Sequence, residues 1–340
     1  MTRVYVELAG EAPALARAEA AGAAEALGGR AAPSDDGADQ GLVAIDLPAA
    51  DGAVRLAERL ALARRIVIRL GPNDRLASLA RAAGSAGGSA AVRRFGRPNS
   101  GGADPDVRRF GAEFVDGGGV IDLEHPARRF WLGTDGVYEE VRAVDRRAAS
   151  ARRMPRLPFQ RPVSLPPRLA RAAANLARLR PGDRVVDPFV GTGSLLAEAG
   201  LVGARLVGID RDPEMIRGAL LNLAHLGLEA EELVVGDSGT VEAGSAARPF
   251  DAVLTDPPYG RSSSTGGESA AELVARVLPR WADRVRPGGR VVAVVSDGSE
   301  PLGSDWVREL SIPVRVHRSL TREFRVYARA DATASRARTT

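Results

Sequence analysis

The sequence predicts an α/β fold, with a mostly parallel sheet in the C-terminal half and a smaller α+β region before it. The main observation is a series of continuous apolar runs separated by helix-like segments: RVVDPF, ARLVGID, ELVVGD, DAVLTDPP and RVVAVVSD. Such runs are typical of parallel strands that are buried on both faces of a sheet. The N-terminal half instead alternates short strands with Ala-rich helices.

In the N-terminal half, apolar periodicity predicts elements with the spacing of a small ferredoxin-like unit. The expected strands are residues 3–8, 42–47 and 65–70, and the expected helices are about 12–27, 51–63 and 75–83. Residues 85–106 are rich in Gly, Ser, Pro and Arg, so we expect a long loop there. Short strands with turn signals are expected within 118–126, 128–136 and 137–145.

Two further apolar segments, 313–320 and 323–329, follow the last apolar run. Because they are close in sequence, we expect an antiparallel hairpin, which would bring the mostly parallel sheet to seven strands. The final residues read as a disordered tail. The expected organisation is a ferredoxin-like unit (1–72), a second α+β unit (73–148), a basic linker (149–168), the α/β domain (169–330) and the tail (331–340).

Composition excludes several kinds of site. The chain has no Cys, which excludes disulfides, zinc–thiolate sites and a thiol nucleophile. Its three His are far apart and lack metal-ligand spacing, so we expect no metal. The chain has no apolar run of about 18 residues, and its N-terminus lacks the layout of a signal peptide. We therefore expect no membrane partner and a cytoplasmic location.

The basic residues are unevenly distributed. All 47 are Arg, and eight of them lie between residues 146 and 171 without any Asp or Glu. Such a run is usually a solvated face, but this one coincides with the Pro-rich join between the two halves, where Arg could follow a nucleic-acid backbone. The candidate phosphate contacts are Arg146, Arg147, Arg152, Arg153, Arg156 and Arg161.

A glycine turn follows the first apolar run of the C-terminal half, in VVDPFVGTGSLLAEA. Gly191 and Gly193 allow a tight turn that a ligand can approach closely. The next strand ends at Asp210, which could accept hydrogen bonds from both ribose hydroxyls, and a third ends at Asp237, which could face an adenine ring. A dinucleotide site has a similar layout, but the third Gly of its fingerprint is missing, which favours a methyltransferase over a dehydrogenase.

The fourth apolar run leads directly into Asp256-Pro257-Pro258-Tyr259. The prolines restrict the backbone, so the Asp256 carboxylate and the Pro257 carbonyl can both be aimed as acceptors at one NH₂ group, while the Tyr259 ring can stack on a base. An exocyclic amine of a purine is a poor nucleophile because its lone pair is delocalised into the ring. Two acceptors favour a pyramidal nitrogen that can attack a methyl sulfonium, and such positioning can lower the barrier by up to about 7–11 kcal/mol.

With these motifs, residues 160–329 resemble a class I, Rossmann-like methyltransferase, and in particular the archaeal-type tRNA guanosine-10 N2-methyltransferase family. The resemblance rests on RPVSLPPRLARAAANLA (161–177), DPFVGTGSLLAEAGL (187–201), TDPPYGRSSS (255–264) and HRSLTREF (317–324). The N-terminal region is similar to the family's ferredoxin-like unit and THUMP domain, which would be residues 73–148. That similarity rests on the layout and on segments such as VIDLEHPARRFWL.

The resemblance implies S-adenosylmethionine as the cofactor and tRNA as the partner, held near its acceptor end by the THUMP region. The catalytic residues would be Asp256, Pro257, Pro258 and Tyr259. The cofactor-binding residues would be Asp187, Pro188, Gly191, Thr192, Gly193, Asp210, Arg211, Asp237 and Ser238. Val190 departs from the family, where small or Cys residues are common, with little expected effect. We expect a monomer, and the sequence gives no sign of an activator subunit.

Other functions remain open. A guanine-N2 methyltransferase acting at tRNA position 6 or on rRNA would tend to carry Asn in place of Asp256. A DNA adenine-N6 methyltransferase also uses this loop, but would more often carry a DNA-recognition insert, and none is evident in the sequence. A non-catalytic RNA-binding protein would not need Asp210, Asp237 and Asp256 together. Whether one or two methyl groups are transferred is also open.

Overall fold

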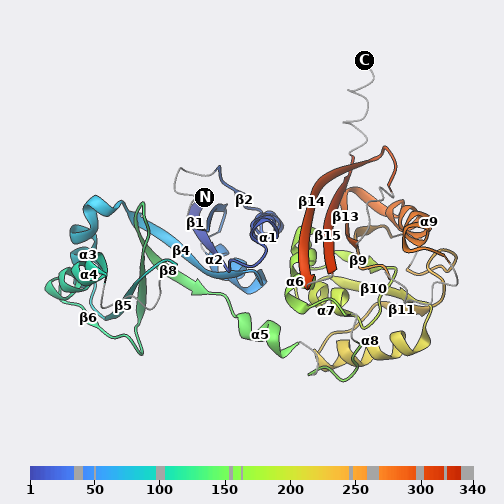
Figure 1. The fold of residues 1–340 in the computed structure, drawn as a ribbon, viewed down its shortest axis with the longest axis horizontal. Coiled ribbons are helices and arrows are strands. Elements are labelled where there is room, and N and C mark those ends of the chain that lie inside the picture. The colour runs from blue at the N-terminus through green and yellow to red at the C-terminus, as the bar shows by residue number, and fades with distance from the viewer. Residues whose placement is uncertain are drawn as a thin grey trace, which may run out of the picture. The chain divides into compact units, whose positions relative to one another are not determined.

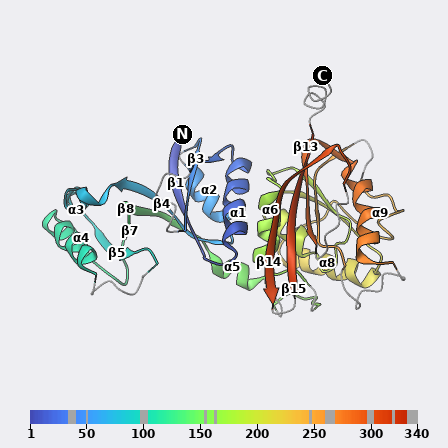
Figure 2. The ribbon, with the colours of Figure 1, turned by 45° about the horizontal axis from the view of Figure 1, so that its top comes forward.

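The computed structural model describes residues 1–33, 41–49, 51–96, 104–152, 156–161, 164–244, 248–258, 268–295, 302–317 and 320–330. Two compact units are present (Figure 1 and Figure 2). The first contains residues 1–13, 27–58 and 63–145, and the second contains 14–26, 59–62 and 146–340. The expected tail, 331–340, lies outside the described residues.

The first unit is built on an eight-stranded sheet with the order β2-β3-β1-β4-β8-β7-β5-β6. The strands expected near 3–8, 42–47 and 65–70 are present as β1, β3 and β4. Strand β4 pairs antiparallel with β8, so the two α+β segments expected at 1–72 and 73–148 share one sheet. The bounds are β1 Thr2–Leu8, β2 Arg30–Ala31, β3 Leu42–Leu47, β4 Ala63–Gly71, β5 Ser89–Arg94, β6 Val120–Ile121, β7 Arg128–Leu132 and β8 Val137–Ala143.

The expectation of a long loop at 85–106 is wrong. Strand β5 lies within this range, pairs in parallel with β7, and buries its three central residues. Helix α4 (Pro105–Asp116) follows and packs on helix α3 (Leu76–Ser85). Just before this region, Gly84 of α3 allows close helix packing, because a Cβ added there would lie 2.1 Å from the Phe114 carbonyl oxygen. Gly87, Gly88 and Gly96 have positive φ values and form the turns on either side of β5. Composition alone does not distinguish these short turns from a long loop.

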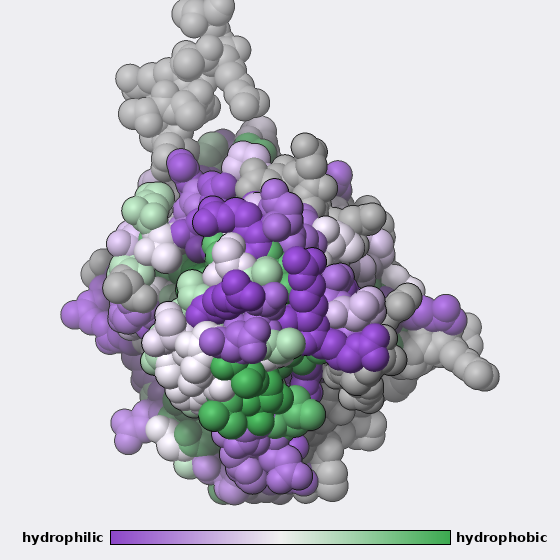
Figure 3. Space-filling view, turned by 90° about the vertical axis from the view of Figure 1, so that its left-hand side faces the viewer, coloured by the Kyte–Doolittle hydropathy of each residue, from purple (hydrophilic) through white to green (hydrophobic). Residues whose placement is uncertain are grey.

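Aromatic side chains form the core between α4 and the sheet of the first unit. Phe110 and Phe114 of α4 are fully buried, with ring centroids 5.1 and 5.7 Å from that of Phe130 on β7. The outer face near α3, α4 and β6 is mostly hydrophilic, with a smaller hydrophobic area (Figure 3). Val115 of α4 and Val120 of β6 are among the exposed apolar residues of this unit.

The second unit contains a seven-stranded sheet with the order β11-β10-β9-β12-β13-β15-β14. Neighbouring strands from β11 to β13 are parallel, and β15 is antiparallel to both of its neighbours. The predicted mostly parallel sheet with a C-terminal hairpin is therefore confirmed, although the hairpin begins earlier than expected. The bounds are β9 Arg184–Asp187, β10 Arg205–Asp210, β11 Glu232–Val235, β12 Phe250–Thr255, β13 Val285–Val295, β14 Trp306–His317 and β15 Leu320–Arg329.

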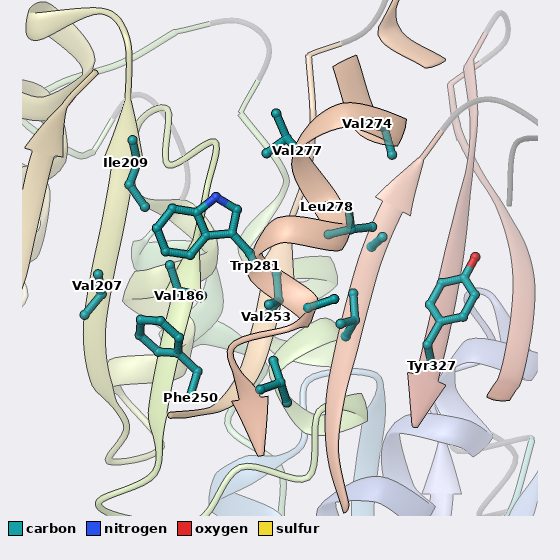
Figure 4. Packing of buried hydrophobic residues seen from close by; sticks show 14 of the residues in the cluster. Val186, Val207, Ile209, Phe250, Val253, Val274, Val277, Leu278, Trp281 and Tyr327 are labelled. Atoms are coloured by element: carbon teal, nitrogen blue, oxygen red, sulfur yellow. The ribbon is translucent and has the colours of Figure 1, made fainter. Parts of the chain in front are cut away.

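A buried indole marks the core between helix α9 and this sheet. Figure 4 shows the Trp281 ring of α9 among apolar side chains of the strands, including Val186, Ile209 and Phe250. No helix in the described ranges is long and apolar enough to cross a membrane. Helices assigned to this unit include α1 Pro13–Ala26, α5 Arg146–Ala151, α6 Pro167–Leu176, α7 Ser194–Gly200, α8 Pro213–His225 and α9 Ala270–Ala282, whereas α2 Gly52–Arg59 falls mainly in the first unit.

Helix α1 joins the second unit through a buried polar cluster. A Cβ added to Gly22 of α1 would lie 2.4 Å from the Asn175 carbonyl oxygen of α6, so only Gly permits this approach. The fully buried Glu19 accepts hydrogen bonds from the backbone N–H groups of Ala61 and Leu62, both at 2.9 Å, and from the Asn175 amide at 3.1 Å. Burial nevertheless raises the pKa of Glu19 to about 7.

Candidate active site

Three acidic residues lie at the carboxyl edge of adjacent parallel strands. Strand β9 lies between β10 and β12, and its last residue, Asp187, is opposite Gly208 of β10. Asp210 ends β10, and Asp256 follows the last residue of β12. Because the strands are parallel, their carboxyl ends meet at one edge, where open α/β sheets bind ligands. The structure therefore brings together the acidic strand ends that the sequence predicted.

The glycine turn lies at the same edge, between β9 and α7. Gly191 and Gly193 have φ values of 51° and 82°, in the region that favours glycine. A Cβ on Gly193 would lie 3.2 Å from the Ala219 Cβ, so this glycine allows α8 to pack closely. Within the described ranges, a Cβ on Gly191 would meet only the Phe189 carbonyl oxygen, at 3.9 Å, so no described residue fills the space beside it.

Asp187 is almost completely buried at the centre of this edge. Its Oδ1 accepts a hydrogen bond from the backbone N–H of Phe189 at 3.0 Å. The pKa of Asp187 is raised to about 8, mainly by burial; the negative charges of Asp256 and Asp210 contribute to the rise, and the hydrogen bond from Phe189 opposes it. Because the charges of Asp256 and Asp210 both act on Asp187, the three carboxyl groups lie close to one another at this edge. The neighbouring Pro188 is also buried.

Asp237 and Ser238 follow strand β11 at the next position along the edge. Asp237 is half-exposed; its Oδ1 accepts a hydrogen bond from the Gly239 N–H at 2.8 Å and pairs with Arg276 at 3.3 Å. The hydrogen bond from Gly239 is the main reason that its pKa is lowered. Ser238 is buried, and its carbonyl oxygen accepts a hydrogen bond from Trp281 Nε1 at 2.8 Å. These bonds fix the loop backbone and leave Asp237 accessible.

Asp256 is held by an arginine that the sequence did not indicate. Its Oδ2 accepts a hydrogen bond from Nη1 of Arg322 on β15. Its Oδ1 is buried and has no hydrogen-bond partner in the part of the chain that the structure describes. Burial raises the Asp256 pKa to about 6, although Arg322 lowers it. Pro257 is buried and Pro258 half-buried, while Tyr259 lies outside the described residues.

A second group that the sequence did not indicate supports the glycine turn from α8. Asn222 of α8 is buried, and its amide donates hydrogen bonds to the carbonyl oxygens of Thr192 and Phe159, both at 2.9 Å. Its Oδ1 accepts a hydrogen bond from the Phe159 N–H at 3.0 Å. The Thr192 hydroxyl also lies 2.8 Å from that of Ser164. The basic linker is therefore attached directly to the cofactor turn expected from the sequence.

Some of the candidate phosphate contacts are open to solvent. Arg147 and Arg156 are exposed, and Arg146 is half-buried. Arg211, expected at the cofactor site, is also exposed at the end of β10. Arg153 lies outside the described residues. Exposure leaves Arg147 and Arg156 accessible to a phosphate group.

Two other candidate phosphate contacts are paired with carboxylates. Arg152 pairs at 2.6 Å with Glu198 of α7, which is buried and also pairs with Arg171 at 2.7 Å. Arg161 pairs with Glu214 near the start of α8 and lies over the Phe159 ring. The side chain of Arg152 is only 16% exposed, so the structure favours a structural role for it over a phosphate contact.

A family profile described as an RMKL-like methyltransferase domain matches residues 155–303, which include the glycine turn and all three acidic strand ends. The tRNA (guanine(10)-N2)-dimethyltransferase of Methanothermobacter thermautotrophicus is 39% identical over 176 residues, or 51% of each chain. The enzyme of the same description from Pyrococcus abyssi is 36% identical over 202 residues, or 58% of each chain. The chain thus spans about half the length of these curated relatives.

A shorter relative is matched over nearly its whole length. It is described as a probable tRNA (guanine(10)-N2)-dimethyltransferase of Methanothermococcus thermolithotrophicus, and it is 32% identical over 169 residues, which are 48% of this chain and 99% of that one. Among solved structures, TrmN from Thermus thermophilus matches with a TM-score of 0.51 and 23% identity, over 96% of this chain and 99% of that one. This structural likeness confirms the α/β methyltransferase fold.

Proposed function

We propose that this chain, which belongs to the tRNA (guanine-N2) methyltransferase family, transfers methyl groups from S-adenosylmethionine to the N2 amino group of a guanosine in tRNA. The observation that carries the proposal is the buried Oδ1 of Asp256 at the carboxyl edge of the sheet, which has no hydrogen-bond partner among the described residues. An exposed acceptor would be satisfied by water, but a buried one requires a donor from a ligand or another group. The names of the relatives support guanosine 10 as the target.

The residues at the edge fit S-adenosylmethionine. No described residue fills the space beside Gly191, so a ligand can lie against the backbone there, and the N–H groups of the turn precede helix α7. Asp210 uses both carboxylate oxygens for backbone N–H groups, but each oxygen can still accept a ribose hydroxyl. Asp237 would face the adenine, and the buried Asp187 would face the amino-acid end. When bound, the cofactor supplies an electrophilic methyl sulfonium.

The Asp256 loop would prepare the guanine nitrogen for attack. Oδ1 of Asp256 and the Pro257 carbonyl oxygen would each accept one hydrogen of the amino group, which turns the nitrogen lone pair toward the methyl group. Tyr259 would stack on the base. With a pKa of about 6, Asp256 is largely ionised at neutral pH and can take the proton that the nitrogen releases.

The partner would be a structured tRNA, because guanine N2 is buried in a stem and must be turned outward to reach the loop. The exposed Arg147 and Arg156 would contact the phosphate backbone near the site. Residues 73–148 would dock the tRNA as a THUMP domain. Position 10 and either one or two methyl groups are the expected outcome, and an rRNA guanine is the alternative substrate.

The test is a nucleoside analysis of tRNA incubated with the full chain and labelled S-adenosylmethionine. Mass spectrometry should detect N2-methylguanosine or N2,N2-dimethylguanosine at position 10. The Asp256→Ala variant should lose at least about 100-fold in rate, since one lost acceptor in a preorganised site costs about 2.7–4 kcal/mol. Its affinity for the cofactor should remain within a few-fold of the parent.

Asp283→Asn is a suitable control, because Asp283 is an exposed carboxylate of the same unit that follows helix α9. It should leave the rate unchanged. Methylation of DNA adenine or of rRNA, with no product on tRNA, would contradict the proposed substrate. Normal turnover by Asp256→Ala would contradict the proposed role of the loop.

A further inference from the structure

We propose that Arg322 is a positioning residue, which holds the Asp256 carboxylate ionised and with Oδ1 turned toward the substrate amine. The inference rests on the proposed function and adds a residue from the C-terminal hairpin to the site. Arg322 does not reach the reacting atoms in this proposal. It acts through Asp256.

The topology of the sheet explains why an arginine of the hairpin reaches this edge. Strand β15 is antiparallel to β13, and Glu323 near its start is opposite Val295 at the end of β13. The first residues of β15 therefore lie at the edge where the parallel strands end. Arg322 precedes Glu323 and is opposite Val314 of β14. A parallel strand in this position would bring its last residues to the site instead.

The contact determines the orientation of the carboxylate. Nη1 of Arg322 donates to Oδ2 of Asp256, and the two side chains retain only 3% and 13% of their exposure. A buried guanidinium has little freedom to move, so Oδ2 remains committed to it. Oδ1 is then the oxygen left to accept a hydrogen from a ligand.

The same contact determines the charge of the carboxylate. Burial disfavours the ionised form of Asp256, and Arg322 opposes this effect through its charge and its hydrogen bond. The carboxyl groups of Asp210 and Asp187 also lie at this edge, and Asp187 is mostly protonated at neutral pH because its pKa is about 8. Without Arg322, Asp256 would carry a proton at neutral pH, and a protonated carboxyl can present an O–H donor to the amine where an acceptor is needed.

The test uses Arg322→Met and Arg322→Lys, with Arg325→Met as the matched control. Arg325 is equally buried on the same strand but pairs with Glu323. Single-turnover rates at saturating cofactor and tRNA are measured from about pH 5.5 to pH 9. In Arg322→Met, the acidic limb of the pH–rate profile should move up by about one to two pH units. A close opposite charge shifts a carboxyl pKa by about 1–3 units, and this variant removes that charge. The rate at pH 7 should fall by about two- to tenfold, as the ionised fraction of Asp256 falls, and should recover toward pH 9.

Arg322→Lys should keep the acidic limb of the pH–rate profile close to that of the parent, because the positive charge is retained. Its maximum rate should be lower, because lysine lacks the planar guanidinium that orients the carboxylate. Arg325→Met should leave the limb in place. A uniform loss at every pH in Arg322→Met, with no shift of the limb, would overturn the proposal. Cofactor affinity measured over the same pH range separates any titration of Asp187 from that of Asp256.

A direct measurement separates this inference from the proposed function. The Asp256 carboxyl is titrated by carbon-13 NMR in the full chain, with Asp256→Asn to assign the signal. Its pKa should rise in Arg322→Met, whether or not tRNA is the substrate. An unchanged pKa would reject the role of Arg322 alone, whereas a shifted pKa in a chain that does not methylate tRNA would reject only the proposed function. Should Arg322→Met not fold, Arg322→Gln is titrated in its place with the same two outcomes.

Discussion

The carboxylate of Asp210 accepts a hydrogen bond from the backbone N–H of Gly191, with Oδ2 2.9 Å from the nitrogen. This bond joins the acid that ends β10 to the glycine turn that follows β9. Its Oδ1 accepts a second bond, from the Asp212 N–H at 3.0 Å. The residue expected to hold the ribose therefore also holds the shape of the turn, and its substitution should affect both.

Asp210→Ala should weaken cofactor binding by roughly 10- to 100-fold, because it removes an acceptor for the ribose and leaves two backbone N–H groups without their partner. Isothermal titration calorimetry with S-adenosylmethionine measures the effect. Asp212→Ala is the control: it removes the N-cap of α8, which costs about 1 kcal/mol of stability, and should leave the affinity near that of the parent. Unchanged affinity in Asp210→Ala would show that this carboxylate does not hold the cofactor.

Removal of the charge at Arg152 should lower stability, whereas removal of the charge at Arg156 should reduce the salt dependence of tRNA binding. Arg152→Ala breaks a pair with the buried Glu198 and should lower the free energy of unfolding by about 1–3 kcal/mol, without changing the salt dependence of tRNA binding. Arg156→Ala should change stability by less than about 0.5 kcal/mol and reduce the slope of log affinity against log salt by about 0.9. Urea denaturation measures the stability of both variants, and binding titrations at several salt concentrations measure the slope. The structural role of Arg152 is contradicted if Arg152→Ala reduces the slope, and the phosphate contact of Arg156 is contradicted if Arg156→Ala does not.

Gly218→Ala should destabilise the attachment of the linker to α8. An added Cβ would lie 1.9 Å from the Phe159 Cδ1, so the ring would have to move away from the helix. Overpacking of this kind costs about 1–3 kcal/mol. Chemical denaturation measures the loss, and Gly303→Ala serves as the control because a Cβ there would meet no described residue within 4 Å. Equal stability of the two variants would mean that Phe159 does not pack on Gly218 in solution.

Asp187→Asn should flatten the pH dependence of stability. The folded-state pKa of Asp187 is raised to about 8, above its ordinary value of 3.8, so the folded protein binds the proton more tightly than the unfolded chain does. The stability linked to this group is therefore fully present below about pH 4 and is lost as the pH rises to about 8. Unfolding free energies of the cofactor-free protein across this range should fall less steeply in the variant. Identical slopes would indicate that Asp187 titrates normally in the folded protein.

Local patterns in the sequence were sufficient to predict most of the second unit. Continuous apolar runs identify buried parallel strands, the glycines mark the turn after β9, and acids or Asp-Pro-Pro mark the strand ends. Because parallel strands all end at one edge, these local signals also predicted that Asp187, Asp210 and Asp256 would lie together. The roles of these residues in binding and catalysis remain predictions.

In the first unit, local patterns were sufficient for β1, β3 and β4 but not for β5. Strand β5 is short, contains no large apolar residue, and is surrounded by glycines, so its composition is that of a loop. It is held in the sheet by parallel pairing with β7, more than 30 residues later in the chain, and its Ala90 and Val92 are buried in the core shared with α3 and α4. Pairing between distant segments overrides local preference in such a strand.

The sequence by itself determined the class of fold, the glycine turn and the acidic strand ends, because each depends on residues that are neighbours in the chain. Only the tertiary structure decided that Arg322 meets Asp256, 66 positions away, that Arg152 is committed to Glu198, and that α1 joins the second unit through Glu19 and Asn175. An arginine has the same charge and periodicity whether it is solvated or buried. Its partner is set by how strands and helices pack, and that depends on the whole fold.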